Sequence, residues 1–182
     1  MHTVEIVIGL GWVAFWIYWL AAAMGVKAGR PRSAPFIGLR VGLPLVIIVL
    51  LRLRVFKAHT TATDPWLAGI GLALFVLGLG LAVWARVYLG RNWGMPMTQK
   101  EQPELVTTGP YHRVRHPIYT GILLAMIGTT LAVSLYLLLV VVIIGAYFVY
   151  SAFAEERFMA SRFPDSYPAY MRSTKMLVPF VF

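Results

Sequence analysis

Long runs of apolar residues dominate the chain, and short polar segments separate them. A helix that crosses the hydrocarbon core of a bilayer needs ~20 mainly apolar residues. The pattern predicts such spans at about 4–26, 36–53 and 66–89, and only Glu5 interrupts the first of them. We expect this first span to be retained, because Met1 to Thr3 lack the basic stretch that begins a cleavable signal.

The last apolar block, from Pro117 to Ala154, contains no charged residue. A straight helix of that length would extend ~55 Å at about 1.5 Å per residue, whereas the hydrocarbon core is ~30 Å thick. The block is therefore predicted to fold back as a helical hairpin, with spans at about 117–132 and 135–153 and a turn around Thr129 to Ser134. The predicted fold class is an all-α integral membrane protein with five transmembrane helices.

The third predicted span is rich in small residues. Gly69, Gly71, Gly78 and Gly80 predict close helix contact, because small residues allow backbones to approach one another in lipid. Arg86, near the end of the same span, is interpreted as a long side chain that snorkels to the membrane surface.

Composition agrees with a membrane protein: 59% of the 182 residues are apolar and 13% are charged, with a mean hydropathy of +0.75. Soluble domains carry roughly 45–50% apolar and about 25% charged residues. The absence of cysteine excludes thiol nucleophiles, disulfides and thiolate metal sites. Because the segments between spans are too short to bury a core, residues 1–182 are predicted to form a single membrane domain.

The formal net charge of +9 is explained by orientation in the membrane rather than by nucleic-acid binding. With five spans, the segments 27–40, 86–116 and 154–182 lie on one side, and they hold 13 of the 16 Lys and Arg residues. The positive-inside bias predicts a multi-pass protein of the cell membrane with its N-terminus outside and its C-terminus in the cytoplasm.

Distinctive polar residues gather where the predicted hairpin begins and ends. The sequence Thr108-Gly109-Pro110-Tyr111 is typical of a turn, and Pro117 suits the first position of a helix. Because the hairpin returns the chain to the same membrane surface, His116 is expected to meet Glu155 and Glu156 there.

This combination of groups matches a zwitterionic amino acid joined to an aromatic base. A helix N-terminus with available backbone donors, beside Arg115 and His116, suits a carboxylate, and Glu155 suits an ammonium group. The flat faces that can hold an aromatic ring or a cation belong to Tyr111, Tyr119 and Trp93. S-adenosylmethionine contains these parts together with a sulfonium.

Simpler explanations exist for each feature alone. His116 could cap a helix, and the tyrosines could belong to an interfacial aromatic belt. Glu155 and Glu156 could pair with Arg157 or Arg162 on a solvated rim, where each pair contributes only ~0–1 kcal/mol.

Two other kinds of site are not expected. His112 and His116 are four residues apart, but the turn residues before Pro117 argue against one helical face, so no metal site is predicted. The sequence contains neither Gly-rich nucleotide fingerprint, which excludes a soluble Rossmann-type methyltransferase domain. Any cofactor must therefore be bound by the membrane helices and the segments at their ends.

The ordered motifs LVTTGPYHRVRHPIYTG and EERF…FPDSYPAYMRSTKMLVP, separated by the hairpin, resemble the isoprenylcysteine carboxyl methyltransferase family. This family belongs to a wider group of small membrane methyltransferases that includes phospholipid N-methyltransferases. The resemblance covers about 89–179 and implies a module there that binds S-adenosylmethionine at the cytoplasmic face. The residues it assigns to cofactor binding are Leu105, Val106, Tyr111, His116, Pro117, Ile118, Tyr119 and Glu155.

The resemblance also bears on the C-terminal region and on the acceptor. Tyr167 and Tyr170 match paired tyrosines of the family, in a short cytoplasmic C-terminal helix that we expect to pack on the core. Carboxyl-methylating members carry an Arg four residues before the first Glu, where this chain has Ser151. Because burying a carboxylate without a cation costs several kcal/mol, an isoprenylcysteine acceptor is disfavoured.

The function predicted is methyl transfer from S-adenosylmethionine to a lipophilic acceptor within the bilayer, with membrane lipids as surroundings and no nucleic-acid partner. If the acceptor is an amine or hydroxyl, Glu156 or His116 would take its proton. Two alternatives stay open. One is a non-catalytic membrane scaffold or binding subunit, and the other is an oxidoreductase like the sterol reductases, whose C-terminal module is similar but whose chains are considerably longer.

Overall fold

The computed structural model describes residues 2–23, 29–31, 64–93, 98–100 and 104–180. Its helices are α1 (His2–Ala23), α3 (Pro65–Leu89), α4 (Pro117–Val133), α5 (Leu138–Arg162) and α6 (Tyr167–Ser173). Short 3-10 turns lie at Gly90–Asn92, Gly109–His112 and Leu135–Leu137. The span predicted at 36–53 lies outside the described residues.

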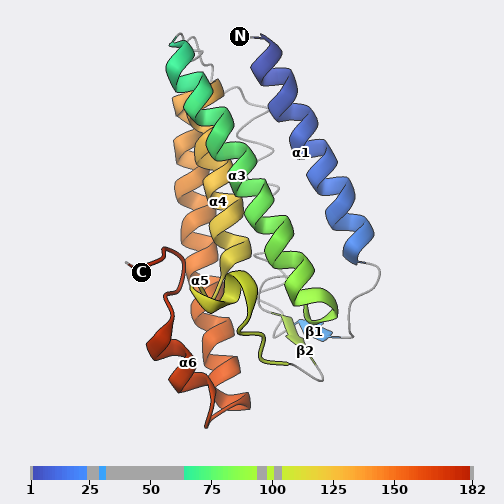
Figure 1. The fold of residues 1–182 in the computed structure, drawn as a ribbon, viewed down its shortest axis with the longest axis vertical. Coiled ribbons are helices and arrows are strands. Elements are labelled where there is room, and N and C mark those ends of the chain that lie inside the picture. Colours follow the sequence, from blue (N-terminus) through green and yellow to red (C-terminus); the bar gives the residue numbers. More distant parts are fainter. Residues whose placement is uncertain (1, 24–28, 32–63, 94–97, 101–103, 181–182) are drawn as a thin grey trace.

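Three segments are long and apolar enough to cross a membrane, namely Thr3–Ala23, Pro65–Leu89 and Leu135–Arg162, and α4 is a shorter apolar helix. In Figure 1, α1 and α3 descend, α4 rises and α5 descends again, which is the predicted hairpin. The predicted spans at 66–89 and 117–132 are therefore confirmed as helices.

Local chemistry explains where the helices begin. Asp64 caps α3 by accepting a hydrogen bond from the Trp66 backbone N–H at 2.9 Å, and Pro65 occupies the first turn. Pro117 opens α4, as the sequence predicts. At the other end of α3, Gly90 has a φ of 52°, a left-handed backbone that glycine adopts readily.

The predicted helical architecture is confirmed, and two expectations about bounds differ from the structure. One antiparallel pair of three-residue strands, β1 (Gly29–Pro31) and β2 (Thr98–Lys100), accompanies the helices. The fifth span is predicted to end at 153, whereas the helix α5 (Leu138–Arg162) continues beyond it, because a helix need not end where its sequence becomes polar. The hairpin turn follows Ser134 rather than spanning 129–134.

The hydroxyls of the two threonines predicted in that turn are satisfied inside α4. Thr129 and Thr130 donate hydrogen bonds at 2.9 Å to the carbonyls of Ala125 and Met126, one helical turn earlier. Their polarity is therefore compatible with a helix in an apolar environment.

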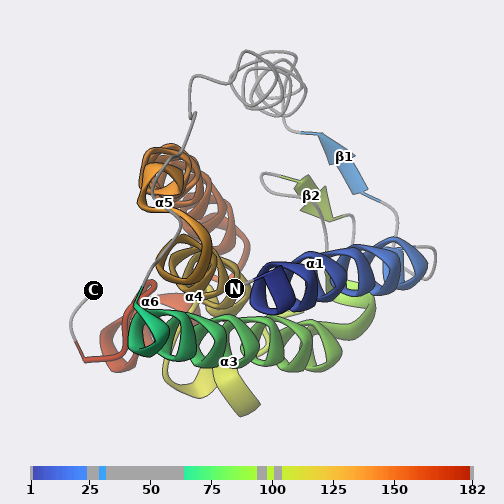
Figure 2. The same cartoon turned by 90° about the horizontal axis from the view of Figure 1, so that it is seen from above.

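Helix α4 lies between α3 and α5 (Figure 2). Its contact with α3 is a small-residue seam formed by Gly71 and Gly78 of α3 and Gly121 and Gly128 of α4. A Cβ atom on Gly71 would lie 2.6 Å from the Gly128 carbonyl oxygen, so the two backbones touch directly.

Only two of the four glycines predicted to mediate helix contact do so. A Cβ atom on Gly69 or Gly80 would meet no described atom within 4 Å, so both face away from the seam. Gly71 and Gly78 are seven residues apart, about two helical turns, and therefore share one face.

Aromatic side chains attach α1 to α3 and α4. The Trp12 ring lies 5.6 Å from the Phe75 ring of α3, and its indole N–H donates a hydrogen bond at 3.1 Å to the Thr129 hydroxyl of α4. This hydrogen bond satisfies two polar groups that lipid could not.

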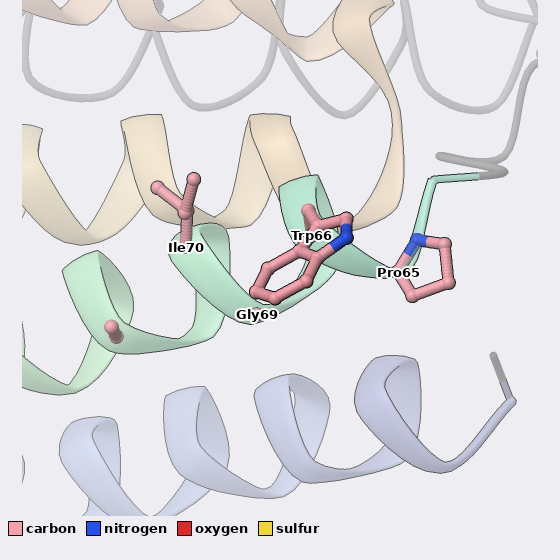
Figure 3. A pocket seen from close by; sticks show the side chains of 5 residues that line it. Pro65, Trp66, Gly69 and Ile70 are labelled. Carbon is pink, nitrogen blue, oxygen red and sulfur yellow. The ribbon is translucent and has the colours of Figure 1, made fainter.

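The two ends of the helical bundle differ in chemistry. At the start of α3, a shallow apolar groove is lined by Pro65, Trp66, Gly69, Ile70 and Ala73 (Figure 3). At the other end, β1, β2, α6 and the polar ends of α4 and α5 lie together (Figure 1). The polar ends of α4 and α5 thus lie at the end of the bundle opposite the apolar groove.

Candidate functional site

The polar cluster of the protein consists of Arg115, His116 and Tyr119 from the start of α4 and Glu155 and Glu156 from α5. His116 stands between the two carboxylates. Its Nδ1 lies 3.7 Å from Glu155 Oε2, and its Nε2 lies 3.3 Å from Glu156 Oε1. The predicted meeting of residues that are about 40 positions apart is confirmed.

Glu156 is the buried carboxylate of the cluster. Its Oε1 accepts a hydrogen bond at 2.6 Å from Arg115 Nε, and the two side chains are only 6% and 9% exposed. Arg115 Nη1 also donates to the carbonyls of Thr174 at 2.7 Å and Met171 at 3.3 Å. Glu156 is therefore part of the protein interior rather than of a solvated rim with Arg157 or Arg162.

Glu155 is the more accessible carboxylate, with 28% of its side chain exposed. The Tyr119 hydroxyl donates a hydrogen bond to Glu155 Oε1 at 2.5 Å. The Tyr119 ring stacks on His116 with centroids 5.4 Å apart and on Phe148 of α5 with centroids 4.4 Å apart. This stack of three nearly parallel rings joins α4 to α5 beside the carboxylates.

Tyr111 is buried at the end of α3, in the predicted turn, which the structure forms at Gly109–His112. Gly109 has a φ of 59° and leaves no room for a Cβ atom, which would lie 2.5 Å from the Tyr88 ring. The Tyr170 hydroxyl of α6 donates to the Tyr111 carbonyl at 2.6 Å, and Tyr167 is buried, so α6 packs on the core.

Burial keeps the tyrosines of this region protonated. It raises the pKa of Tyr170 to about 12, where the charge of Arg115 opposes the effect and that of Glu156 adds to it. Burial also raises the pKa of Tyr111, which the nearby Tyr170 and Glu155 raise further. Both hydroxyls are neutral hydrogen-bond donors at physiological pH.

The remaining residues assigned to cofactor binding surround this cluster to different degrees. Pro117 and Ile118 are buried in the first turn of α4, and Val106 packs against the same core as Tyr111. Leu105 is half-buried. The fold thus places most of the residues that the resemblance assigns to cofactor binding at one end of the bundle.

The backbone N–H groups of the two residues before α4 are paired within the protein. The Arg115 N–H donates to the Lys175 carbonyl at 2.8 Å, and the His116 N–H donates to the Met176 carbonyl at 3.1 Å. These two groups are therefore held by the returning chain. The N–H groups of the first turn of α4, on Ile118 and Tyr119, are the helix-terminal donors, and their use by a ligand carboxylate stays a prediction.

Arg86 does not snorkel, and sequence reasoning missed its role. The residue is only 5% exposed, and its guanidinium donates at 2.6 Å to the carbonyls of Ala22 in α1 and Gly90. It also covers the Trp93 ring, with its Cζ 4.7 Å from the ring centroid. Its partners are backbone carbonyls and a ring, so no motif indicates them.

Ser151 lies one helical turn before Glu155 and is fully buried. Its hydroxyl has no hydrogen-bond partner among the described residues. The structure therefore shows a small neutral side chain within the protein at the position that the resemblance pairs with an arginine.

The sequence matches the phospholipid methyltransferase family over residues 66–166, which is more than half of the chain. The chain belongs to this family. The expected similarity to isoprenylcysteine carboxyl methyltransferases is also confirmed.

Relatives of the chain include proteins with different described roles. It is 29% identical to the cobalt-zinc-cadmium resistance protein CzcN of Cupriavidus metallidurans, over 77% of this chain and 63% of that protein. It is 28% identical to protein-S-isoprenylcysteine O-methyltransferase B of Arabidopsis thaliana, over 64% and 61%. It is 29% identical to a methanethiol S-methyltransferase of a Pseudomonas species, over 64% and 48%. The chain spans less than two thirds of the length of these relatives.

A solved structure shares the fold. The eukaryotic intramembrane Ras methyltransferase ICMT superposes with a TM-score of 0.61 at 24% identity, over 79% of this chain and 53% of that one. Together with the apolar helices, this likeness supports a multi-pass membrane protein. The residues matched by the family, 66–166, include the whole polar cluster.

Proposed function

We propose that this chain is an integral-membrane enzyme that transfers a methyl group from S-adenosylmethionine to a lipophilic acceptor. The observation that carries the proposal is the position of His116 between Glu155 and Glu156, at the end of a helical hairpin within the family's matched region. A polar site at the end of apolar helices can be reached by a water-soluble donor from the aqueous side and by a lipophilic acceptor from the bilayer.

The donor site fits the chemistry of S-adenosylmethionine. Glu155 offers a carboxylate that is partly accessible, as an ammonium group requires, and Tyr119 fixes that carboxylate by a hydrogen bond. The faces of the Tyr119 ring are covered by His116 and Phe148, so Tyr111 is the aromatic side chain proposed to contact the adenine ring or the positive sulfonium. Leu105, Val106, Pro117 and Ile118 supply the apolar walls, and His116 lies beside Glu155.

The chemical step requires alignment more than acid or base catalysis. S-adenosylmethionine supplies a methyl group on a positively charged sulfur, which an acceptor attacks in line. Holding two reactants in that geometry can supply ~7–11 kcal/mol of the barrier. We expect the buried start of α4 and the bound donor together to limit the access of water to the reacting atoms. Any proton from the acceptor is proposed to pass to His116 or Glu156, of which Glu156 is already bonded to Arg115.

The acceptor atom is proposed to be neutral rather than a carboxylate. Ser151, four residues before Glu155, is fully buried and carries no charge, so it offers no partner for an anion. An unpaired buried carboxylate costs several kcal/mol. Relatives described as acting on isoprenylcysteine and on methanethiol show that acceptors vary among related proteins.

The end of the bundle that bears the polar cluster is proposed to face the cytoplasm, with the N-terminus outside. The support is the clustering of basic residues in the segments at that end, among them Arg113, Arg115, Arg157 and Arg162. Because the chain has no cysteine, single cysteines introduced at Arg172 and at Thr3 can report the side of each terminus by labelling with an impermeant maleimide.

Calorimetric titration with S-adenosylhomocysteine, the product of the donor, tests the cofactor. The full chain in detergent should bind this ligand, and Glu155→Gln should weaken binding by roughly tenfold or more, because an ammonium loses its counter-charge. Arg157→Gln, an exposed neighbour on α5, serves as the matched control and should leave binding unchanged. The proposal fails if the wild-type chain binds nothing at millimolar ligand.

Labelled methyl transfer in membranes tests the acceptor. Membranes that contain the protein, given S-adenosylmethionine with a radioactive methyl group, should yield labelled material that partitions into organic solvent. Mild alkali releases methanol from carboxyl methyl esters but not from methylated nitrogen or sulfur. We expect the label to remain with the lipophilic product, and release as methanol would show that the acceptor is a carboxylate after all.

A further inference from the structure

Arg115 connects three separate parts of the chain. Its backbone directly precedes α4, its Nε bonds Glu156 of α5 at 2.6 Å, and its Nη1 bonds the Thr174 carbonyl at 2.7 Å. Both charged side chains are largely buried. A buried arginine with this set of partners fixes the relative position of the elements it joins.

The segment 174–177, which follows α6, is fastened to the same place. The bond from Arg115 N–H to the Lys175 carbonyl is followed by one from Lys175 N–H to the Arg113 carbonyl at 3.2 Å. The Thr120 hydroxyl of α4 donates to the Leu177 carbonyl at 2.6 Å. The C-terminal segment 174–177 is therefore hydrogen-bonded to the residues at the start of α4.

A continuous chain of contacts leads from this segment to the accessible carboxylate. The Thr174 carbonyl holds Arg115, and Arg115 holds Glu156. Glu156 Oε1 also contacts His116 Nε2, and the opposite ring nitrogen of His116 faces Glu155. The position of Arg115 therefore sets where His116 and Glu155 stand relative to one another.

We propose that Arg115 is a positioning residue of the donor site and not a ligand of the donor carboxylate. It acts through Glu156 and the C-terminal segment to set the spacing between His116 and Glu155. The inference rests on the proposed binding of S-adenosylmethionine and replaces the direct role that the sequence indicates for Arg115. The C-terminal segment is by the same argument a required part of the donor site.

Two ligands separate a positioning role from direct contact. S-adenosylhomocysteine carries both the ammonium and the carboxylate, whereas its decarboxylated analogue keeps the adenosine, the sulfur and the ammonium. If Arg115 acts through Glu156 to set the spacing between His116 and Glu155, Arg115→Ala weakens both ligands by the same factor, roughly tenfold or more. If Arg115 holds the carboxylate, the loss is confined to S-adenosylhomocysteine, and that result would overturn the inference.

Further variants of the full chain test the route of action. Glu156→Gln should weaken both ligands in parallel, and the double variant with Arg115→Ala should be no weaker than the worse single variant, because both changes break one connection. Fully additive losses would contradict the proposed route. Arg113→Ala, an exposed arginine two residues away, is the matched control and should bind both ligands as the wild type does.

The test remains decisive if Arg115→Ala does not fold. Arg115→Lys keeps the charge but cannot bond Glu156 and the Thr174 carbonyl as a planar guanidinium does. If Arg115 is a positioning residue, Arg115→Lys weakens the binding of both ligands in parallel. If Arg115 instead binds the donor carboxylate directly, lysine can largely take over that contact, and the affinity for both ligands stays close to that of the wild type. Failure of the proposed function is distinguishable, because the wild type would then bind neither ligand.

Discussion

The two faces of α4 are built on different principles. Toward α3, glycine faces glycine and the backbones touch along the small-residue seam. Toward α5, the contact is made by a stack of aromatic rings and by the charged groups of the polar cluster. The seam depends on the close fit of two backbones, whereas the contact with α5 depends on ring stacking and on charged hydrogen bonds. Changes at the seam should therefore act on folding first, and changes at the polar cluster should act on ligand binding.

The difference matters because α4 carries the start of the site. The seam fixes α4 against α3, and that places Tyr111, which packs at the end of α3, close to Tyr119. Helix α5 brings the carboxylates to this fixed pair. A membrane protein that lacks a hydrophobic driving force between helices can in this way separate the contacts that hold the helices from those that bind a ligand.

The largest effect should come from adding one carbon atom to the seam. A Cβ atom in Gly78→Ala would clash with the backbone of Ala125, and overpacking of this kind costs typically 1–3 kcal/mol or more. We expect a lower melting temperature in detergent and loss of ligand binding only as a consequence. Gly80→Ala makes the same exchange two residues away, where nothing described lies within 4 Å, and should not be destabilised.

The polar cluster should respond in the opposite way. His116→Ala removes the imidazole between the two carboxylates and one ring of the stack, so affinity for S-adenosylhomocysteine should fall by roughly tenfold or more. The melting temperature should change less than in Gly78→Ala. A variant that binds normally but melts early would show that His116 only caps the helix.

A smaller effect is expected when only a hydroxyl is removed. Tyr119→Phe keeps the ring stack and leaves the Glu155 carboxylate in place, and it loses only the hydrogen bond that orients this carboxylate. Ligand affinity should therefore fall by severalfold at most, without a change in folding. The exposed Tyr136, altered to phenylalanine in the same way, provides the control.

The smallest effect sharpens the comparison between the two faces. A Cβ atom on Gly145 of α5 would lie 3.8 Å from its nearest neighbour, a methyl group of Leu123, which is ordinary contact distance. Gly145→Ala should be neutral or stabilising by up to about 1 kcal/mol, because alanine favours a helix. Thermal unfolding of Gly145→Ala and Gly78→Ala in parallel is the measurement. A similar loss of stability in both variants would show that the two faces of α4 are packed equally tightly, and would contradict the comparison.

The sequence predicts best where a physical limit applies. The charge-free block from Pro117 to Ala154 is too long for one span, which required the hairpin and with it the meeting of His116 and Glu155. The α4 start followed from Pro117, whose ring fits only the first turn. Each of these conclusions depends on length or on backbone chemistry that a single sequence displays.

What the sequence could not predict depends on partners that have no residue-type signature. Arg86 binds backbone carbonyls of Ala22 and Gly90, and Arg115 binds those of Met171 and Thr174. Any residue supplies a carbonyl, so composition does not mark these contacts. The sequence also could not show which glycines of α3 face α4. The four glycines lie on more than one face of the helix, and only the position of the neighbouring helix selects Gly71 and Gly78.

The central claim is that one bound donor touches residues from both ends of the hairpin. An experimental structure of the full chain with S-adenosylhomocysteine tests it most directly. The account predicts the ligand's ammonium group within hydrogen-bonding distance of the Glu155 carboxylate and its body against His116 and Tyr119. A ligand bound elsewhere, or one that contacts α4 but not α5, would contradict the account.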